Sequence, residues 1–228
     1  MKRNFKKAVS LLLVALMVLS LVACGSGVQT IKKDENKGTG KYAGQTVILH
    51  TNDVHGAVEG YSYLPALKAE IEKEGGSVIL ADAGDFTNGN IYVSISEGES
   101  AVTLMNQAGY DVVALGNHEF DDAANGLIYF TNTTDFPIIC ANADFSRFDS
   151  INIKPYVIIE NQGVKIAILG LLETDYNGTP SIKPVNAEGI DFRDALEVAP
   201  EYSFLSNESA VFIALTHIGY KYDTILAK

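Results

Sequence analysis

The segment Ser77-Val-Ile-Leu-Ala-Asp-Ala-Gly-Asp85 does most to decide the fold of this chain. It opens with a short apolar run without polar alternation, which is typical of a strand buried on both faces of a parallel sheet. The polar pair Gly84-Asp85 follows the run. Three other apolar runs are also followed by polar clusters: residues 46–49 by Asp53-Val54-His55, residues 111–115 by Gly116-Asn117-His118-Glu119, and residues 210–215 by Thr216-His217.

The four clusters lie where a ligand site is expected, because ligands of open α/β sheets bind outside the carboxyl ends of the strands. They place there two aspartates, an asparagine and three histidines: Asp53, Asp85, Asn117, His55, His118 and His217. The sequence has only four histidines, and the remaining one, His50, ends the first of these strands. Histidines scattered through a core would not be sorted in this way.

The residue types in the clusters suit a divalent metal ion. Carboxylate and imidazole ligands together favour a borderline cation such as Mn, Zn, Fe or Co. Each cluster alone has an ordinary explanation: a polar turn for Asp53-x-His55 and for Gly84-Asp85, a capped loop for residues 116–119, and a core histidine for His217. All four together at strand ends are far more specific, and we therefore predict a metal site.

The rest of the chain alternates between predicted strands and helices. Gly163 lies in a short turn that joins two apolar runs, 156–160 and 164–172, as an antiparallel hairpin. The other elements that we expect are strands at 45–51, 77–82, 111–115, 136–141 and 209–215, helices at 61–74, 96–108, 122–131 and 191–205, and a long loop at 173–189. This alternation predicts an α/β fold, a layered sandwich around mixed β-sheets.

The N-terminus has the pattern of a secretory signal peptide, with basic residues before a short apolar stretch. It ends in Leu21-Val-Ala-Cys24-Gly25, which resembles the lipobox of bacterial lipoproteins. We therefore predict a signal peptide at 1–23, a flexible tether at 24–44 that carries a lipidated Cys24, and a folded domain at 45–228. The protein would be exported and anchored at the extracellular or periplasmic face of the membrane. An uncleaved anchor helix is the alternative, and it would also hold the protein at a membrane.

Composition narrows the possible partners. A hydrophobic content of 47% and a charged content of 20% fit a globular protein. The net charge of −11 argues against nucleic-acid binding, which needs a positive surface. An anionic substrate would need local help, such as metal ions, to be held. The second cysteine, Cys140, lies in a predicted strand, and we assign it no chemistry.

The clusters with their flanks resemble the calcineurin-like metallophosphoesterases, and most of all the secreted bacterial 5′-nucleotidase and sugar-nucleotide hydrolase branch. The matching segments are Ile48-Leu-His-Thr-Asn-Asp-Val-His-Gly56, Asp82-Ala-Gly-Asp85, Tyr110-Asp-Val-Val-Ala-Leu-Gly-Asn-His-Glu-Phe-Asp121 and Leu215-Thr-His-Ile-Gly-Tyr220. The resemblance runs from Gln45 to the end of the chain and implies a four-layer α/β sandwich.

The resemblance also implies roles for the site residues. Asp53 and His55 would bind a first metal ion, Asp85 would bridge two metal ions, and Asn117 and His217 would bind the second. His118 would be the catalytic histidine, which stabilises the transferring phosphoryl group or protonates the leaving oxygen. The implied activity is hydrolysis of a phosphoester, such as an extracellular nucleotide, by a water that two metal ions activate. No Gly-x-Ser-x-Gly or P-loop motif points to another mechanism.

One family feature is absent from the printed sequence. In the family, a Gly-His-x-His-type motif follows the strand of His217 and supplies a further ligand to each metal. A C-terminal domain that binds the nucleoside usually comes after it. We therefore expect a fold that is incomplete at its C-terminus, and we assign no substrate-binding residues. Two alternatives remain open: an inactive, membrane-tethered remnant that binds metal or nucleotide, and a solute-binding lipoprotein.

Overall fold

A computed structural model describes residues 28–228 of the chain, apart from residue 37 and residues 176–177. The predicted signal peptide and Cys24 lie outside the described residues. The strands are β1 (Thr30–Lys32), β2 (Thr46–Thr51), β3 (Ser77–Asp82), β4 (Val112–Ala114), β5 (Ile138–Ile139), β6 (Ala143–Asp144), β7 (Tyr156–Asn161), β8 (Val164–Leu172), β9 (Asp191–Phe192) and β10 (Val211–His217). The α-helices are α2 (Leu64–Lys73), α3 (Ile91–Ile95), α4 (Glu99–Ala108), α5 (Ala123–Thr133), α6 (Ala195–Val198), α7 (Leu205–Glu208) and α8 (Tyr220–Leu226).

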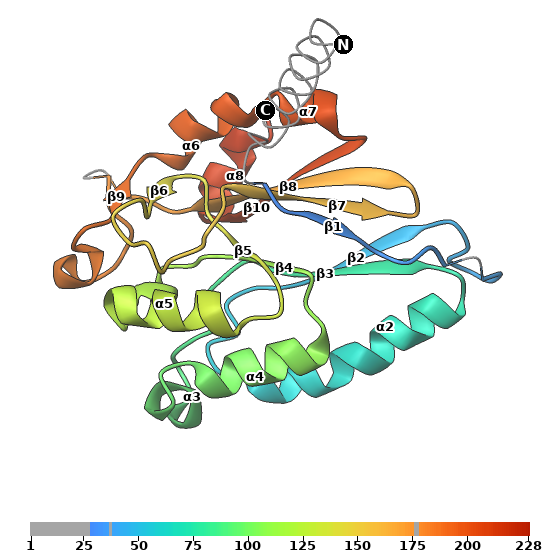
Figure 1. The fold of residues 1–228 in the computed structure, drawn as a ribbon, viewed down its shortest axis with the longest axis horizontal. Helices are drawn as coiled ribbons and strands as arrows, with labels where there is room; N and C mark the ends of the chain where they lie inside the picture. The colour runs from blue at the N-terminus through green and yellow to red at the C-terminus, as the bar shows by residue number, and fades with distance from the viewer. Residues whose placement is uncertain (1–27, 37, 176–177) are drawn as a thin grey trace, which may run out of the picture.

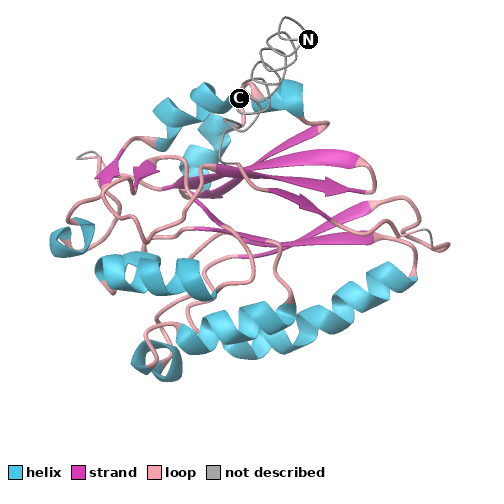
Figure 2. Cartoon of the chain, in the orientation of Figure 1, coloured by secondary structure: helices cyan, strands magenta, loops and turns pink. Residues whose placement is uncertain are grey.

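The strands form two four-stranded sheets and a small two-stranded one. The first sheet has the order β2-β3-β4-β5 and is parallel throughout. The second has the order β1-β7-β8-β10 and is mixed, because β7 and β8 form the predicted antiparallel hairpin whereas β1 and β10 run parallel to their neighbours. The two sheets lie one above the other, with α2, α4 and α5 below the first and α6 and α7 above the second (Figures 1 and 2).

The side chains of the strands alternate between separate cores, as expected for a pleated strand. In β3, Ile79 and Ala81 belong to a core between the two sheets, whereas Leu80 belongs to a core between the first sheet and the helices α4 and α5. In β8, Ile168 faces the core between the sheets, and Leu169 faces a third core under α6 and α7. Three cores separate four layers, so the predicted layered α/β sandwich is confirmed.

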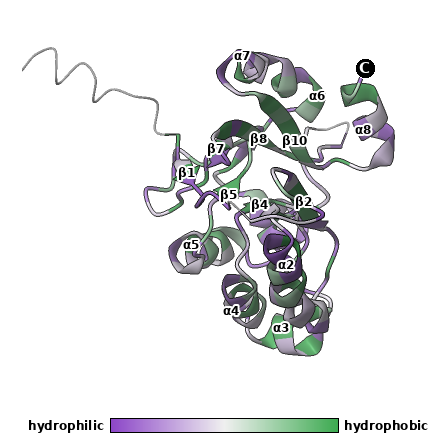
Figure 3. Cartoon of the chain, turned by 90° about the vertical axis from the view of Figure 1, so that its right-hand side faces the viewer, coloured by the Kyte–Doolittle hydropathy of each residue, from purple (hydrophilic) through white to green (hydrophobic). Residues whose placement is uncertain are grey.

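Burial of the strands depends on their place in the sheet. Every residue of the central strand β3 is buried, as its continuous apolar run predicts. The strands β2 and β10 are edge strands and stay partly exposed, so the expected burial on both faces is wrong for them. Apolar segments of both edge strands are visible in Figure 3. An edge strand lacks a neighbour on one side, which leaves part of its surface in contact with solvent.

The predicted flexible tether is wrong for much of its length. Residues 30–32 form β1, which pairs with β7. Two hydrogen bonds continue this attachment: Asn36 Nδ2 donates to the carbonyl oxygen of Gly76 at 2.7 Å, and Tyr42 N donates to that of Glu74 at 2.9 Å. Residues before Gln45 are therefore part of the folded structure. The segment is polar, so its composition did not indicate that it forms an edge strand.

Three predicted helices differ from those in the structure: one is divided, and two begin later than expected. Residues 191–205 form the short strand β9 and then α6, a 3-10 turn at Ala199–Tyr202, and α7. Pro200 lies at the start of that 3-10 turn, and a proline lacks the N–H that a continuous helix needs. The helix predicted at 96–108 is α4 alone, because Gly98 takes a left-handed conformation in front of it. The helix predicted at 61–74 begins as a 3-10 turn at Val58–Tyr63. Among the residues that the structure describes, no helix has the length and apolar character needed to cross a bilayer.

Candidate metal centre

The predicted clusters meet at one edge of the molecule. The loops after β2, β3 and β4 leave the same edge of the parallel sheet, because parallel strands end on the same side. The fourth cluster comes from the other sheet, where His217 is the last residue of β10. His217 Nδ1 lies 2.9 Å from the carbonyl oxygen of Ala83, which can only accept, so Nδ1 carries the hydrogen. This bond joins the two sheets directly at the site.

The loops that carry the site residues turn through left-handed backbone conformations. The φ angles are 51° at Asp53, 45° at His55 and 59° at Asp85, with a glycine of φ 100° at Gly84. Positive φ is unfavourable for residues other than glycine, and such conformations cluster at functional sites. The sharp turns aim neighbouring side chains toward one point.

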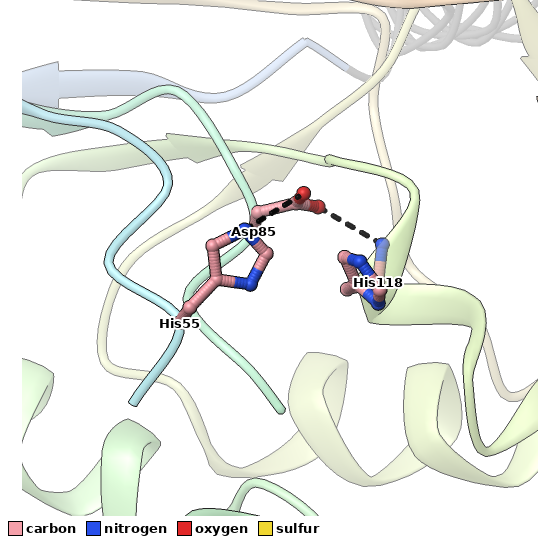
Figure 4. Close-up of side chains that lie close together, drawn as sticks. All are labelled: His55, Asp85 and His118. Carbon is pink, nitrogen blue, oxygen red and sulfur yellow. Dashed lines mark hydrogen bonds and ion pairs between the residues drawn. The ribbon is translucent and has the colours of Figure 1, made fainter. Parts of the chain in front are cut away.

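Asp85 lies at the centre of the cluster and is only 3% exposed. Its Oδ2 lies 3.6 Å from His55 Nε2 and 3.3 Å from His217 Nε2. Its Oδ1 accepts the backbone N–H of His118 at 2.9 Å. Figure 4 shows His55, Asp85 and His118 converging from three separate loops. Asp85 therefore lies within reach of all three site histidines.

Among the residues that the structure describes, two groups of side chains could each hold a metal ion, and Asp85 belongs to both. One group is His55, Asp85 and His118, and the other is Asp53, Asp85 and His217, with the ligand atoms of each group within 4.8 Å of one another. Asn117 belongs to neither group, and its Nδ2 donates to the carbonyl oxygen of Ser181 at 3.4 Å. The structure therefore brings five of the six predicted residues together: Asp53, His55, Asp85, His118 and His217. The grouping differs from the predicted division, which placed His55 with Asp53.

Charge within the cluster shows why these residues suit a cation. Burial alone would lower the pKa of His217, but the hydrogen bond and charge of Asp85 outweigh it and raise that pKa to about 9. Burial would raise the pKa of Asp85, but His217 and the N–H of His118 lower it overall. The carboxylate is therefore held ionised beside an imidazolium. A metal ion would replace that proton, because ligands must be deprotonated to bind it.

The residues that hold His118 in place were not predicted from the sequence. Its Nδ1 lies 2.8 Å from Asp121 Oδ2, and Asn88 Nδ2 donates to the same carboxylate at 2.5 Å. Burial alone would lower the pKa of His118, but Asp121 and Asp85 raise it. Asp121 stands three residues after His118 in the quoted motif, a spacing that a single helical turn brings to one side, so this partner could have been found. Asn88 belongs to a different loop and carried no signal.

A cavity of about 410 Å³ opens beside His118. Its lining includes Thr87, Asn88, Ser94 and Asp121, together with Lys183 on the opposite loop. A larger cavity, of about 780 Å³, lies next to β6 and β9 and includes none of the predicted site residues. The smaller cavity is therefore the one that could take part of a ligand bound at the cluster.

A layered α/β fold that gathers aspartates and histidines around one shared carboxylate at its strand ends defines a metallophosphoesterase. The chain belongs to the calcineurin-like phosphoesterase family, which matches residues 46–225. It is related to bacterial 5′-nucleotidases. It is 32% identical over 225 residues to a 5′-nucleotidase of Vibrio cholerae, an alignment that covers 92% of this chain and 40% of that protein. His/Asp clusters suited to divalent metals are thus present in a chain of a metal-dependent family.

Solved structures agree with this relationship. The crystal structure of a 5′-nucleotidase precursor from Thermus thermophilus matches with a TM-score of 0.70 and 28% identity, over 79% of this chain and 38% of that one. The NAD nucleotidase of Haemophilus influenzae matches with a TM-score of 0.68 and 26% identity, over 79% of this chain and 35% of that one. The chain therefore has the fold of the metallophosphoesterase domain and spans less than half the length of these relatives.

Proposed function

We propose that this chain is a metal-dependent hydrolase of phosphate esters that acts on extracellular 5′-nucleotides. One observation carries the proposal: the buried carboxylate of Asp85 belongs to two separate groups of potential metal ligands in a calcineurin-like fold. The names of the relatives, which are 5′-nucleotidases and an NAD nucleotidase, support nucleotides as the substrate class.

The residues present fit a pair of divalent cations. Asp53, His55, Asp85, Asn117 and His217 would hold them, and their mixed oxygen and nitrogen donors suit Mn, Zn, Fe or Co. When bound, such a pair supplies a water nucleophile at neutral pH and neutralises charge on the phosphate.

His118 would act on the leaving oxygen. Asp121 can only accept a hydrogen bond when ionised, so Nδ1 of His118 carries a hydrogen toward it. The Nε2 atom is left to face the ligand. A histidine oriented in this way can donate a proton to the departing alcohol, a contribution of about 10²–10⁴-fold in rate. Asp121 would keep the ring in place during that transfer.

Phosphate release from a 5′-nucleoside monophosphate tests the proposal. We expect turnover by the full chain in Mn²⁺ and none in chelator, with Asp85→Asn inactive and His118→Gln slower by about 10²–10⁴-fold. His50→Gln is the matched control, because His50 is exposed and lies outside both ligand groups. Equal rates for the His118 and His50 variants would contradict the catalytic role.

Export and membrane anchoring through Cys24 are also part of the proposal. The lipobox-like segment at residues 21–25 supports them. Intact mass of the protein from a bacterial membrane fraction tests the assignment. We expect a chain that starts at Cys24 with an added lipid, and a Cys24→Ser variant that stays unmodified. A wild-type chain without added mass at Cys24 would rule out the lipid anchor.

A further inference from the structure

We propose that Glu119 is a positioning residue whose carboxylate clasps two metal-ligand loops together. The inference rests on the proposed function only in that it assigns the loops to metal binding. Glu119 contributes no ligand atom to either group. It is 1% exposed, and its side chain points away from solvent into the protein beneath Asp85.

One oxygen of the carboxylate joins the two loops. Oε2 accepts the backbone N–H of Asp85 at 2.8 Å and that of Gly116 at 2.7 Å. Asp85 follows β3, whereas Gly116 follows β4 and directly precedes Asn117 and His118. Glu119 Oε2 therefore fixes the distance between the loop that carries Asp85 and the loop that carries Asn117 and His118.

The other oxygen holds the first loop in its shape. Oε1 accepts the backbone N–H groups of Phe86 at 3.0 Å and Thr87 at 3.2 Å, and the hydroxyl of Thr87 at 3.1 Å. With Asp85 in the left-handed region, the N–H groups of residues 85–87 point to one side and form a concave anion site. Glu119 supplies the anion from within the chain. The carboxylate thus stabilises the turn that presents Asp85 to the metal site.

The clasp is reciprocal and leaves little room for movement. Asp85 Oδ1 accepts the N–H of His118 at 2.9 Å, so each loop sends a carboxylate to the backbone of the other. The loops also touch: a Cβ atom on Gly84 would lie 2.3 Å from the nitrogen of Gly116. Loss of one carboxylate should therefore displace the partner loop as well as its own.

A glutamine at position 119 has the right shape and the wrong hydrogen-bonding groups. Each of the two carboxylate oxygens of Glu119 accepts hydrogen bonds from its own pair of backbone N–H groups. The amide nitrogen of glutamine can only donate, so one of these pairs would face a donor. Glu119→Gln should weaken the clasp without creating a cavity.

The test is Mn²⁺ binding to the metal-free full chain, measured by calorimetry. We expect the dissociation constant of Glu119→Gln to rise by about 10- to 100-fold, as for other residues that orient metal ligands. Glu70→Gln makes the same chemical change on an exposed helix position and should bind as wild type. Ile166→Ala destabilises the buried core at the far end of β10 from the site, because Ile166 pairs with Val211 at the start of that strand, and it should also leave Mn²⁺ affinity unchanged. A folded Glu119→Gln with wild-type affinity, or an Ile166→Ala with the same loss, would overturn the inference.

Thr87→Val keeps the test decisive should Glu119→Gln not fold. It removes the hydroxyl that lies 3.1 Å from Glu119 Oε1 and 3.0 Å from the carbonyl oxygen of His118, and it keeps the backbone bonds to the carboxylate. We expect a smaller but measurable rise in the dissociation constant, and unchanged affinity would overturn the inference. A different result would reject the proposed function alone. If Mn²⁺ binding depends on Glu119 but the chain releases no phosphate, the role of Glu119 stands and the hydrolase activity is ruled out. A wild-type chain that binds no Mn²⁺ would overturn both.

Discussion

Asp85 and its neighbours adopt backbone conformations that few side chains tolerate. Gly84 and Asp85 both have positive φ, and the same holds for Asp53 and His55 in the adjacent loop. Strain of this kind persists only where surrounding contacts enforce it. Here the enforcing contacts are known: the N–H of Asp53 donates to the carbonyl oxygen of Gly84, and that of His55 to the carbonyl oxygen of Asp85. The two loops therefore stabilise each other.

Gly116→Ala should disable the site. A Cβ atom at this position would lie 2.1 Å from Asp85 Oδ1 and 2.5 Å from Asp85 N, which no ordinary contact allows. The loops would have to separate, and both Mn²⁺ affinity and phosphate release should fall by more than about tenfold. Gly163→Ala provides a comparison, since a Cβ atom there would meet nothing within 4 Å. Its effect should be confined to a modest loss of stability from its positive φ. Full Mn²⁺ binding by Gly116→Ala would contradict the close approach.

Asp82 should give the fold a measurable dependence on pH. The residue is fully buried, and its carboxyl accepts from the N–H of Gly84 and the hydroxyl of Thr51. Burial raises its pKa to about 7, against the opposing effect of these two hydrogen bonds. Because its pKa is higher in the folded than in the unfolded chain, the folded chain holds the proton more tightly. This contribution is complete below about pH 4 and is lost as the pH rises toward 7.

Asp82→Asn removes the titrating group and keeps its shape. The free energy of unfolding of the wild type should fall relative to that of the variant between about pH 4 and 7, by about 1.4 kcal/mol for each pKa unit of difference. Urea titrations of both proteins at several pH values, in chelator so that metal does not contribute, measure the difference. Parallel stability curves over this range would show that Asp82 has an ordinary pKa.

At the scale of residues, the sequence predicted the candidate metal ligands better than the residues that hold them in place. Asp53, His55, Asp85, Asn117, His118 and His217 were selected because each follows an apolar run, and the structure brings all of them except Asn117 into the two potential ligand groups. Glu119, Asp82 and Asn88 were missed. Their roles depend on hydrogen bonds to distant segments: Glu119 to the backbone after β3, Asp82 to the hydroxyl of Thr51, and Asn88 to the carboxylate of Asp121. The spacing of residue types along a chain does not reveal such bonds.

The segment at residues 30–44 is the element that the sequence describes least well. Lys33 contacts both oxygens of Asp111 at 2.8 Å and also donates to the carbonyl oxygen of Val78. Asp111 in turn accepts the N–H of Leu80 at 2.8 Å. Lysine and asparagine are common in flexible linkers, so composition alone suggested a tether. The pairing partners lie at 78–80, 111 and 158–160, far along the chain, and were not visible from the local sequence.

Lys33→Met should loosen this segment and lower stability. The Lys33 and Asp111 side chains are 17% and 14% exposed, so removal of one charge leaves the other poorly solvated. Fully buried pairs lose 3–5 kcal/mol when one partner is removed, and this partly buried pair should lose ~1–3 kcal/mol. Lys32→Met is the matched control, because Lys32 is 75% exposed in its pair with Glu160 and should lose less than ~1 kcal/mol. Equal losses in urea denaturation of the two variants would show that the segment is not anchored through Lys33.

The regular elements, by contrast, were largely predictable. The buried run of β3 and the short turn of the β7–β8 hairpin have local signals that the structure confirms. Errors arose at helix boundaries, where Pro200 and Gly98 divide segments with an apolar pattern. The order of strands in the two sheets was not predicted, because it depends on contacts between segments that are distant in the sequence.

At the scale of the whole molecule, the candidate centre is assembled across two sheets. Asp53, His55, Asp85, Asn117 and His118 come from loops of the parallel sheet, and His217 comes from the mixed sheet. The core between the sheets keeps their relative position, and the bond from His217 to Ala83 fixes it at the site. Alignment of strand ends within one sheet follows from general rules. His217 was expected at the site because it follows an apolar run, but the sequence did not predict that its strand belongs to a second sheet.

The most direct test of this account is anomalous diffraction from crystals of the full chain grown with Mn²⁺. The account predicts two manganese peaks, about 3.5–4 Å apart, that share the carboxylate of Asp85. One peak should lie near His55 and the other near His217. Manganese bound elsewhere, or a site that leaves Asp85 without a metal contact, would contradict the central claim.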